Sequence, residues 1–310
     1  MKILLVIAAS VLVFLLSGGY YVFVRACRRG RELSWEDPSS LRKTQWAPLA
    51  DRIGETIAYL RDHKACDIYT RSDDGLSLRA RWLPARDAIG SILLFHGYRS
   101  CPLADFSVVI PFYHSLGFNL LLADQRSHGK SEGEYITFGI REHRDVAKWI
   151  AYHNENLGLL PVYLGGMSMG ATTVLMAAGR QLPENVKGVS ADCGFTTPKE
   201  ILREVMGQAR IPAFPLLNIT GWYTRLFAGF GLEEYSTCLA METCRVPVIM
   251  LHGMADRFVP CEMSKRTFEA CHSEKQLLLV EGATHGTSYL TDRPRCQKAL
   301  TDFLLDHLGN

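Results

Sequence analysis

The sequence VYLGGMSMG at residues 162–170 places an apolar run of strand character directly before a G-x-S-x-G pattern. The residues that follow, Met169–Arg180, have the composition of a helix, so Ser168 is predicted to lie on a sharp turn between a strand and a helix. Glycines on both sides leave room for the crowded backbone, and the serine hydroxyl then projects beyond the end of the strand. The positive end of the helix dipole points at negative charge that develops there. This context predicts that Ser168 is a nucleophile.

The rest of the chain repeats the order of strand and helix on both sides of this turn. Runs that are apolar on both faces are typical of buried parallel strands, and their alternation with helices indicates βαβ units. Strands are predicted at residues 92–95, 118–123, 162–164, 186–191, 246–251 and 277–280. Helices are predicted between most of them, at Ile140–Asn156, Met169–Arg180 and Glu262–His272. The predicted fold class is therefore α/β, with a mostly parallel central sheet flanked by helices.

Three segments fall outside this repeat. The runs Cys66–Thr70 and Leu76–Leu83 flank Asp73-Asp74-Gly75 and predict a β-hairpin, and residues 35–63 predict one amphipathic helix leading into the domain. Between Asp192 and Val246, more than fifty residues rich in Phe, Trp, Leu and Pro exceed what one crossover helix needs. We expect a helical cap there, at about residues 196–242, over the carboxyl edge of the sheet.

An acid and a base follow two of the later strands, in the chain order expected after a G-x-S-x-G turn in a parallel sheet. Asp256 comes just after the run that ends at Leu251, and His285 lies in the loop after the last strand. His285 would take the proton of Ser168, and Asp256 would hold the imidazole in the correct tautomer and stabilise its cation. Asp192 also follows a strand and is the alternative acid. Ser, acid and His follow one another in this order along chains that carry a triad on this type of sheet.

Two backbone N–H groups are predicted to stabilise the oxyanion. One is that of Met169, the residue after the nucleophile, and the other is that of Tyr98, in the loop after the strand at 92–95. The Tyr98 side chain would then line the acyl pocket. His96 and His252 each precede a glycine at a strand end, and we interpret both as loop braces rather than metal ligands.

Taken together, the motifs resemble those of the α/β-hydrolase superfamily. The matching segments are FHGY, LLLADQRSHGKSEG, GMSMGA, HGMAD and THG, in this order, and the resemblance covers about residues 65–308. It is closest to bacterial hydrolases that carry an N-terminal membrane anchor. The resemblance implies a triad of Ser168, Asp256 and His285 with oxyanion donors at Tyr98 and Met169. It also implies that the loop Asp124–Gly133 braces the site, so that Asp124, Arg126 and His128 are structural.

The N-terminus has the character of a membrane segment. Leu4–Val24 contains no charged residue. As a helix, a stretch of this length crosses the hydrocarbon core of a bilayer. A cleaved signal peptide is the alternative, with Ser17 and Gly19 at a cleavage site. Four arginines follow the segment, so the positive-inside rule favours a single-pass anchor with the catalytic domain on the cytoplasmic side. The predicted division is an anchor with its basic flank (1–31), a linker with the leading helix (32–64) and the hydrolase domain (65–310).

Composition excludes several classes of protein. A formal net charge of +2, without a basic patch in the body of the chain, argues against a nucleic-acid partner. The nine cysteines form no C-x-x-C pair, and we expect reduced and mostly buried thiols, including an inert Cys193. The absence of H-E-x-x-H, G-x-G-x-x-G and P-loop patterns predicts no metal and no nucleotide cofactor.

The function predicted from these residues is hydrolysis of an ester or thioester, with a small-molecule acyl substrate attached transiently to Ser168. The cap would supply an apolar acyl pocket, for which the candidates are Phe214, Trp222, Tyr223 and Phe227. Three alternatives stay open. They are a small-peptide or amide hydrolase with the same triad, acyl transfer to an acceptor other than water, and a non-catalytic binding protein of the same fold. Oligomeric state cannot be read from the sequence.

Overall fold

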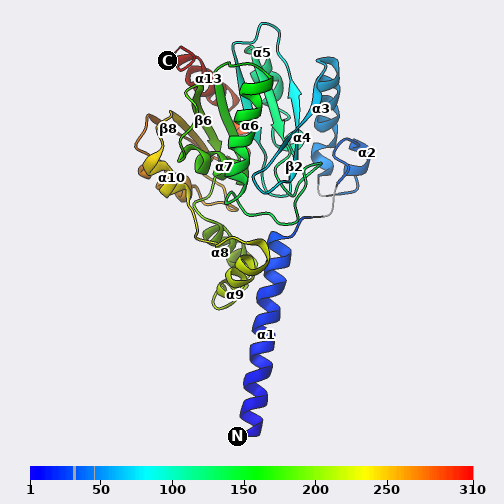
Figure 1. Cartoon of the computed structure of the whole chain (residues 1–310), viewed down its shortest axis with the longest axis vertical. Coiled ribbons are helices and arrows are strands. Elements are labelled where there is room, and N and C mark those ends of the chain that lie inside the picture. The colour runs from blue at the N-terminus through cyan, green and yellow to red at the C-terminus, as the bar shows by residue number, and fades with distance from the viewer. Residues whose placement is uncertain (31–32, 45, 310) are drawn as a thin grey trace.

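The computed structural model describes residues 1–30, 33–44 and 46–309, which fold around an eight-stranded sheet (Figure 1). The strand order is β1-β2-β4-β3-β5-β6-β7-β8, with antiparallel pairing only where β2 meets β1 and β4. The strands are β1 (Cys66–Arg71), β2 (Ser77–Leu83), β3 (Gly90–Phe95), β4 (Phe118–Ala123), β5 (Val162–Met167), β6 (Val186–Asp192), β7 (Val248–Gly253) and β8 (Lys275–Val280). This arrangement confirms the predicted mostly parallel sheet and the hairpin before it.

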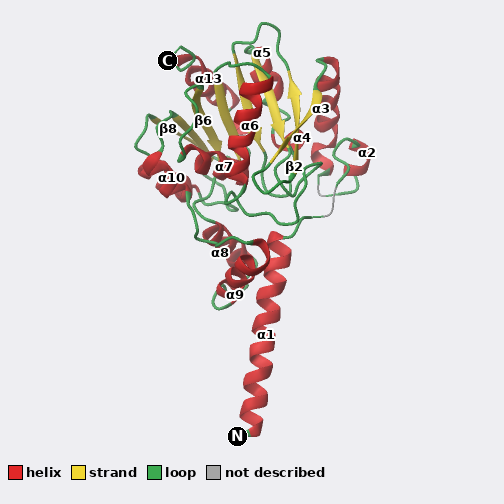
Figure 2. Ribbon diagram, viewed as in Figure 1, coloured by secondary structure: helices red, strands yellow, loops and turns green. Residues whose placement is uncertain are grey.

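Helices cover both faces of the sheet (Figure 2). The period of two in a strand explains the division, since Ile92 and Leu94 of β3 join the core under α3, α5 and α13, whereas Leu93 and Phe95 join the core under α6, α7 and α10. The helices in the body of the chain are α2 (Pro38–Leu41), η1 (Ala47–Leu49), α3 (Ala50–Asp62), α4 (Pro102–Asp105), α5 (Ile110–Ser115), α6 (Glu142–Asn156), α7 (Met169–Ala178), α8 (Pro198–Gln208), α9 (Leu216–Tyr223), η2 (Thr224–Ala228), α10 (Thr237–Thr243), α11 (Cys261–Ala270), α12 (Ser288–Thr291) and α13 (Arg293–Asp306).

One predicted element is shorter than expected. The leading helix predicted over 35–63 is wrong in its first half, because the long helix α3 begins only at Ala50. The two turns before it, α2 and η1, each carry a proline at their start, Pro38 and Pro48. Proline is tolerated there but lacks the N–H that a continuous helix would need, and it restricts the residue before it.

The segment between β6 and β7 holds the helices predicted as a cap. Helices α8 and α9 and the π-helical turn η2 stand beyond the carboxyl edge of the sheet (Figure 1). Helix α10 falls within the same predicted range, but it packs against α7 and α11 on the face of the sheet. The part of the segment that covers the sheet edge is therefore α8, α9 and η2.

The N-terminal helix α1 (Lys2–Cys27) extends away from the body (Figure 1). Its first half is exposed, whereas Gly19, Phe23 and Cys27 are buried against the cap and the loop after β4. The Thr220 hydroxyl of α9 donates a hydrogen bond to the Gly19 carbonyl, at 3.1 Å. Among the described residues, α1 is the one helix long and apolar enough to cross a membrane. The structure thus places half of this helix in contact with the folded domain.

The turn between β5 and α7 depends on the closest approaches of backbone to backbone near the sheet edge. A Cβ atom at Gly170 would overlap the carbonyl oxygen of Phe95 at the end of β3, and one at Gly166 would overlap the carbonyl of Gly170. Both distances lie well inside van der Waals contact, and the neighbouring atoms are backbone that cannot rotate away. These two glycines therefore allow α7 to start directly beside the end of β3.

We expect Gly170→Ala to prevent normal folding, because the new methyl group must displace the Phe95 carbonyl from β3. Gly207→Ala is the matched control, since that helical glycine in α8 has no atom within 4 Å of its Cβ position. Alanine there should stabilise the protein by about 0.5–1 kcal/mol through helix propensity. Yield of monodisperse protein and thermal unfolding would test this. Equal stability of the two variants would contradict the close-approach argument.

Candidate active site

Ser168 occupies a strained position at the junction of β5 and α7. Its φ of 54° and ψ of −115° lie outside the regions that non-glycine residues favour, and its backbone N–H is held by the Asp192 carbonyl at 2.8 Å. The residue is 6% exposed, at the start of α7. The hydroxyl is thus directed out of the sheet edge by a turn that the surrounding backbone holds in place.

The structure brings Ser168, His285 and Asp256 into one hydrogen-bonded series. His285 Nε2 lies 2.9 Å from Ser168 Oγ, and His285 Nδ1 lies 2.7 Å from Asp256 Oδ2. Since an ionised carboxylate only accepts, Nδ1 carries the proton and Nε2 is free to accept the serine proton. The alternative acid Asp192 instead accepts a hydrogen bond from the Ser288 hydroxyl at 3.0 Å. Asp256 is therefore the carboxylate that orients this imidazole.

The Asp256 carboxylate is held from several directions. Its Oδ1 accepts the backbone N–H groups of Phe258 and Val259, at 2.8 and 2.9 Å. His252 Nε2 lies 3.3 Å from Oδ2 and 2.9 Å from the Val259 carbonyl, so its N–H serves both oxygens. Burial raises the pKa of Asp256, but the hydrogen bonds from His252, His285 and the Val259 N–H outweigh it, and the pKa lies well below its usual value. Asp256 therefore stays ionised at neutral pH, and the predicted loop brace His252 also contacts the acid.

The two amides predicted to bind an oxyanion belong to the residue after the serine and to the loop that follows β3. The Met169 N–H is at the first position of α7, where a helix has no internal acceptor for it. Within the described chain, neither this amide nor that of Tyr98 donates a hydrogen bond to another backbone group. The loop of Tyr98 is close to the serine, since a Cβ added at Gly97 would lie 3.3 Å from Ser168 Cβ. Both amides therefore lack a backbone acceptor in the described chain, as the predicted oxyanion donors must.

Asp105 holds this loop, and sequence reasoning did not identify it. Its Oδ2 accepts the Gly97 N–H at 2.6 Å, and its Oδ1 accepts the Ser100 hydroxyl at 2.5 Å. Burial raises the pKa of this carboxyl, against the lowering effect of both hydrogen bonds. A single acid in a short segment carries no pattern that distinguishes it from a surface residue. The only signal was its place eight residues after the glycine whose amide it accepts.

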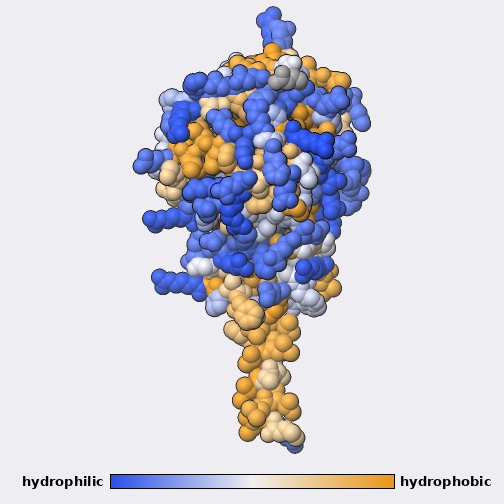
Figure 3. Space-filling view, turned by 90° about the vertical axis from the view of Figure 1, so that its left-hand side faces the viewer, coloured by the Kyte–Doolittle hydropathy of each residue, from blue (hydrophilic) through white to orange (hydrophobic). Residues whose placement is uncertain are grey.

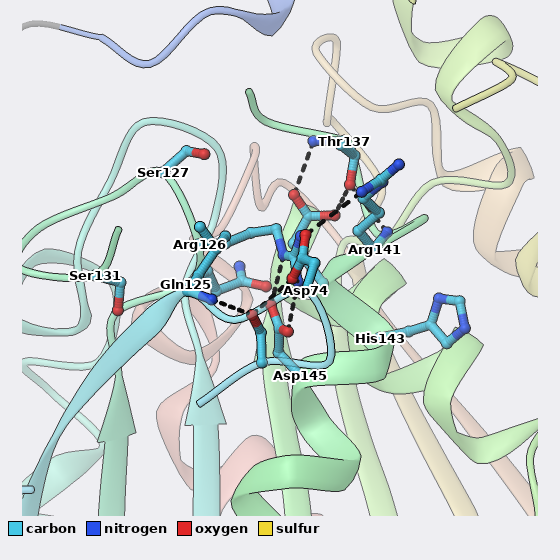
Figure 4. A network of polar contacts seen from close by, with 12 residues as sticks. Asp74, Gln125, Arg126, Ser127, Ser131, Thr137, Arg141, His143 and Asp145 are labelled. Carbon is cyan, nitrogen blue, oxygen red and sulfur yellow. Dashed lines mark hydrogen bonds and ion pairs between the residues drawn. The ribbon is translucent and has the colours of Figure 1, made fainter. Parts of the chain in front are cut away.

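The loop Asp124–Gly133 is fastened to the body by a buried ionic network (Figure 4). The Arg126 guanidinium forms two bonds of 2.7 Å with Asp145 and two further bonds, of 2.9 and 3.1 Å, with Asp74 in the β1–β2 turn. The Asp124 carboxylate accepts hydrogen bonds from the Arg79 guanidinium at 3.2 Å and from the Lys130 backbone N–H at 3.0 Å. Planar two-point pairing of this kind fixes orientation as well as distance. Both side chains therefore have the contacts expected of structural residues.

Two buried histidines connect this loop to the loop of Tyr98. His96 accepts the Gln125 amide through Nε2 at 3.1 Å, and His128 accepts the Arg99 amide through Nε2 at 3.0 Å. Both rings donate through Nδ1 to backbone carbonyls, so each is held as one neutral tautomer. Burial lowers the pKa of His96 to about 4 and that of His128 to about 3. The brace around Tyr98 therefore consists of uncharged imidazoles.

Two cavities meet at Ser168. One, of about 350 Å³, extends toward α3 and α5 and is lined by Trp46, Tyr113 and His285 among others. The second, of about 410 Å³, is lined by apolar side chains of α8, including Ile201 and Val205, and by the end of α1. Tyr98 lines both cavities. The reacting hydroxyl thus lies between two separate spaces of the size that small ligands occupy.

The four aromatic residues predicted for the acyl pocket are elsewhere. Among the described residues that line these two cavities, none is Phe214, Trp222, Tyr223 or Phe227. Phe214 and Trp222 are exposed, at 78% and 53%, and Tyr223 and Phe227 pack on Phe23 of α1. The prediction took these four residues of the cap to face the acyl chain, and the lining of the two cavities gives it no support. The side of α9 and η2 that bears Trp222, Tyr223 and Phe227 faces α1 and the surroundings, and Phe214 is exposed in the turn before α9.

Cys193, Asp256 and His285 are the one group of possible metal ligands found in the described part of the chain, with ligand atoms within 4.8 Å of one another. A metal would need the thiolate form of Cys193, and burial raises the pKa of this thiol well above its usual value. Asp256 and His285 are already bonded to each other and to Ser168. The chemistry of this group therefore fits proton transfer better than metal binding.

Comparison with known proteins supports the α/β-hydrolase fold. The family described as alpha/beta hydrolase fold matches residues 90–211. The uncharacterized protein YqkD of Bacillus subtilis strain 168 is 27% identical over 234 residues, which cover 74% of this chain and 76% of YqkD. The uncharacterized protein YfhR of Escherichia coli K12 is 24% identical, over 84% of this chain and 90% of its own. The structure of the Pyrococcus furiosus esterase Pf2001 superposes with a TM-score of 0.65 at 21% identity, covering 81% and 94% of the two chains. The resemblance inferred from the motifs is confirmed at the level of the fold.

We expect Asp105→Ala to lower kcat by ~10-fold to 100-fold with little change in KM, because a displaced Tyr98 amide weakens stabilisation of the transition state alone. Asp105→Asn should retain most of the activity, since its amide can accept from Gly97 and donate to Ser100. Steady-state kinetics on a chromogenic ester would measure both. Equal losses in the two variants would show that the negative charge, rather than the hydrogen bonds, is what matters.

The buried histidines make stability depend on pH. The folded-state pKa of His128 lies below its ordinary value of 6.5. Between pH 7 and pH 5 this histidine therefore binds a proton in the unfolded chain but not in the folded one. The free energy of unfolding falls as a result, by ~2 kcal/mol at pH 5. His128→Gln removes this penalty. We therefore expect the wild-type advantage in the free energy of unfolding to shrink by about that amount from pH 7 to pH 5.

The comparison isolates His128 because other groups are common to both proteins. Asp145 and Asp192, whose pKa values burial raises to about 6, give the opposite pH trend in wild type and variant alike. Urea titrations at the two pH values would supply the free energies. A difference between the proteins that stays constant with pH would mean that His128 is not held neutral.

Proposed function

We propose that this chain, which has the α/β-hydrolase fold, is a serine hydrolase that cleaves an ester or thioester through an acyl-enzyme at Ser168. The observation that carries the proposal is the series from Ser168 Oγ through His285 to Asp256, with bonds of 2.9 and 2.7 Å, at a strained strand-to-helix turn. Backbone strain of this kind persists only where the surrounding structure enforces it, and strained residues are concentrated at active sites. A surface serine and histidine that met by chance would need neither the strained turn nor the buried acid.

The reaction follows from the positions of these groups. Ser168 Oγ attacks the acyl carbon while His285 Nε2 takes its proton, and the ionised Asp256 stabilises the imidazolium that forms. The developing oxyanion accepts the N–H groups of Tyr98 and Met169. His285 then gives the proton to the leaving alcohol or thiol, and water activated by the same imidazole releases the acid. Two cavities at Ser168 provide separate spaces for the acyl and leaving groups.

Esters and thioesters are favoured as the substrate class by the character of these cavities. The cavity beside α8 is lined mainly by apolar side chains, which suits an acyl chain rather than a polar peptide. The structural similarity to the Pyrococcus furiosus esterase Pf2001 also favours an ester as the substrate. The substrate is proposed to be a small molecule, without a nucleic-acid partner.

The helix α1 is proposed to be a retained membrane anchor rather than a cleaved signal. Cleavage after Gly19 would remove the residues against which Leu216 and Ile219 of α9 pack. Arginines Arg25, Arg28 and Arg29 follow the apolar stretch, and all nine cysteines are free, which fits a reducing compartment. The domain is therefore proposed to lie on the cytoplasmic side.

Labelling with a fluorophosphonate tests the proposal. We expect one covalent adduct by intact mass on the wild-type chain, because the probe reacts with a serine only where a base activates it. Ser168→Ala should show no adduct, and Asp256→Asn should be labelled slower by ~10³-fold or more, since its amide stabilises the wrong tautomer of His285. Ser115→Ala, which removes an exposed hydroxyl on α5, is the control and should label as wild type does.

An absence of adduct on folded wild-type protein would contradict the proposal and favour a binding protein of the same fold. An adduct that persists in Ser168→Ala would show that another residue is the activated nucleophile. If labelling succeeds, a panel of esters, thioesters and amides with one acyl group would determine the bond that is cleaved.

A further inference from the structure

The membrane helix forms part of the wall of the cavity that contains the reacting serine. The 410 Å³ cavity is bounded on one side by Tyr21, Val22, Arg25 and Ala26 of α1, and it reaches Ser168 on the other. The Tyr98 hydroxyl donates to the Ala26 carbonyl at 2.8 Å, so the proposed oxyanion loop also contacts this helix. An anchor that only tethered the domain would not need to approach the site.

Helix α1 is fixed to the cap by close packing rather than joined to it loosely. Gly18 and Gly19 let Leu216 and Ile219 of α9 approach the α1 backbone, and a Cβ added at Gly19 would lie 2.7 Å from Ile219 Cβ. Tyr20 lies edge-on to Tyr223, with ring centroids 5.3 Å apart. Small residues at such a contact are typical of helices that associate in membranes. The wall that α1 contributes is therefore part of the folded structure.

The position of this contact along α1 gives the depth of the cavity relative to a bilayer. The uncharged stretch Leu4–Val24 spans ~31 Å as a helix, which matches the hydrocarbon core. In a bilayer that this stretch spans, Tyr21 and Val22 would lie at the edge of the hydrocarbon and Arg25 at the level of the headgroups. The cavity would then open at the boundary between hydrocarbon and water, next to the acyl chains.

The cap exposes several large apolar side chains next to α1. Side chains of the cap that would be costly to expose to water are 37–78% exposed: Ile211, Phe214, Trp222, Leu226 and Phe227. Figure 3 shows apolar surface along the free part of α1 up to its junction with the body. Tryptophan and other aromatic side chains are enriched at the membrane interface. Contact with lipid would therefore give Phe214, Trp222 and Phe227 a role outside the acyl pocket.

We propose that the substrate is a long-chain acyl ester resident in the membrane, and that its acyl chain reaches Ser168 laterally from the bilayer through the cavity between α1 and α8. This inference rests on the proposed serine hydrolase activity. The chain occupies the cavity while Ser168 Oγ forms a bond to the acyl carbon and the bond from that carbon to the leaving oxygen breaks. The leaving alkoxide takes its proton from His285. Water then cleaves the acyl-enzyme, and the fatty acid returns to the bilayer.

Filling the cavity from α1 tests this placement in the full chain, reconstituted in vesicles of phosphatidylcholine and phosphatidylglycerol. Val22→Trp should lower kcat/KM for 4-methylumbelliferyl oleate by at least ~10-fold, the effect of excluding two methylenes from an apolar site. Turnover of 4-methylumbelliferyl acetate should change little, because an acetyl group does not extend into the cavity. Val13→Trp makes the same change at an exposed position of α1 and should affect neither ester.

A second variant protects the test against misfolding of the first. Val205→Phe narrows the same cavity from α8 and should show the same selective loss with oleate. Retained acetate turnover demonstrates that a variant is folded. If both variants turn over both esters as wild type does, the placement of the chain is overturned while the proposed hydrolase activity stands. If wild type cleaves neither ester and Ser168 takes no fluorophosphonate, the proposed activity itself fails.

A separate experiment tests whether the ester reaches the site from the bilayer, by varying the membrane in which the ester is placed. The oleate ester is placed either in the vesicles that hold the enzyme or in separate vesicles, and initial rates are read before it exchanges between them. Access from the bilayer predicts a faster initial rate when enzyme and ester share a membrane. Equal initial rates in both arrangements would show that the ester arrives through water, and would overturn lateral access.

Discussion

The close approach of the start of α7 to the end of β3 is the constraint on which the site depends. Glycines at 166 and 170 allow the turn to pass beside the Phe95 carbonyl, and this contact directs Ser168 out of the sheet edge with φ of 54°. The same contact places the first amide of α7 beside the loop that follows β3. The proposed nucleophile and the proposed oxyanion donors are therefore both positioned by one backbone crossing.

The parallel sheet explains why so much of the site could be predicted. Carboxyl ends of parallel strands meet at one edge, so polar residues found after separate apolar runs were expected to converge there. The structure does bring His285 to Ser168 and Asp256, across 117 and 29 residues of chain. Asp105 could not be predicted in this way, because a hydrogen bond from a side chain to the Gly97 amide leaves no periodicity in the sequence. The catalytic roles stay predictions until Ser168 is tested chemically.

The cap shows where sequence reasoning reaches its limit. Its length and aromatic content predicted helices over the sheet edge, but not the direction in which each side chain points. That direction depends on the contact between Gly19 and Thr220, which are 201 residues apart. Because α1 occupies one side of the cap, the aromatics of α9 and η2 pack on it or face outward, and smaller side chains such as Val22 and Val205 line the cavity. Helix α1, the cap and the cavity therefore form one structural unit.

The most direct test of this account is the structure of the full chain in a lipid nanodisc after reaction with a fluorophosphonate that carries a long alkyl chain. The account predicts phosphorus bonded to Ser168 Oγ, the phosphoryl oxygen facing the amides of Tyr98 and Met169, and the alkyl chain between α1 and α8. Phosphorus on another residue would contradict the assignment of the nucleophile. An alkyl chain that runs instead into the cavity beside Tyr113 would contradict the role given to helix α1.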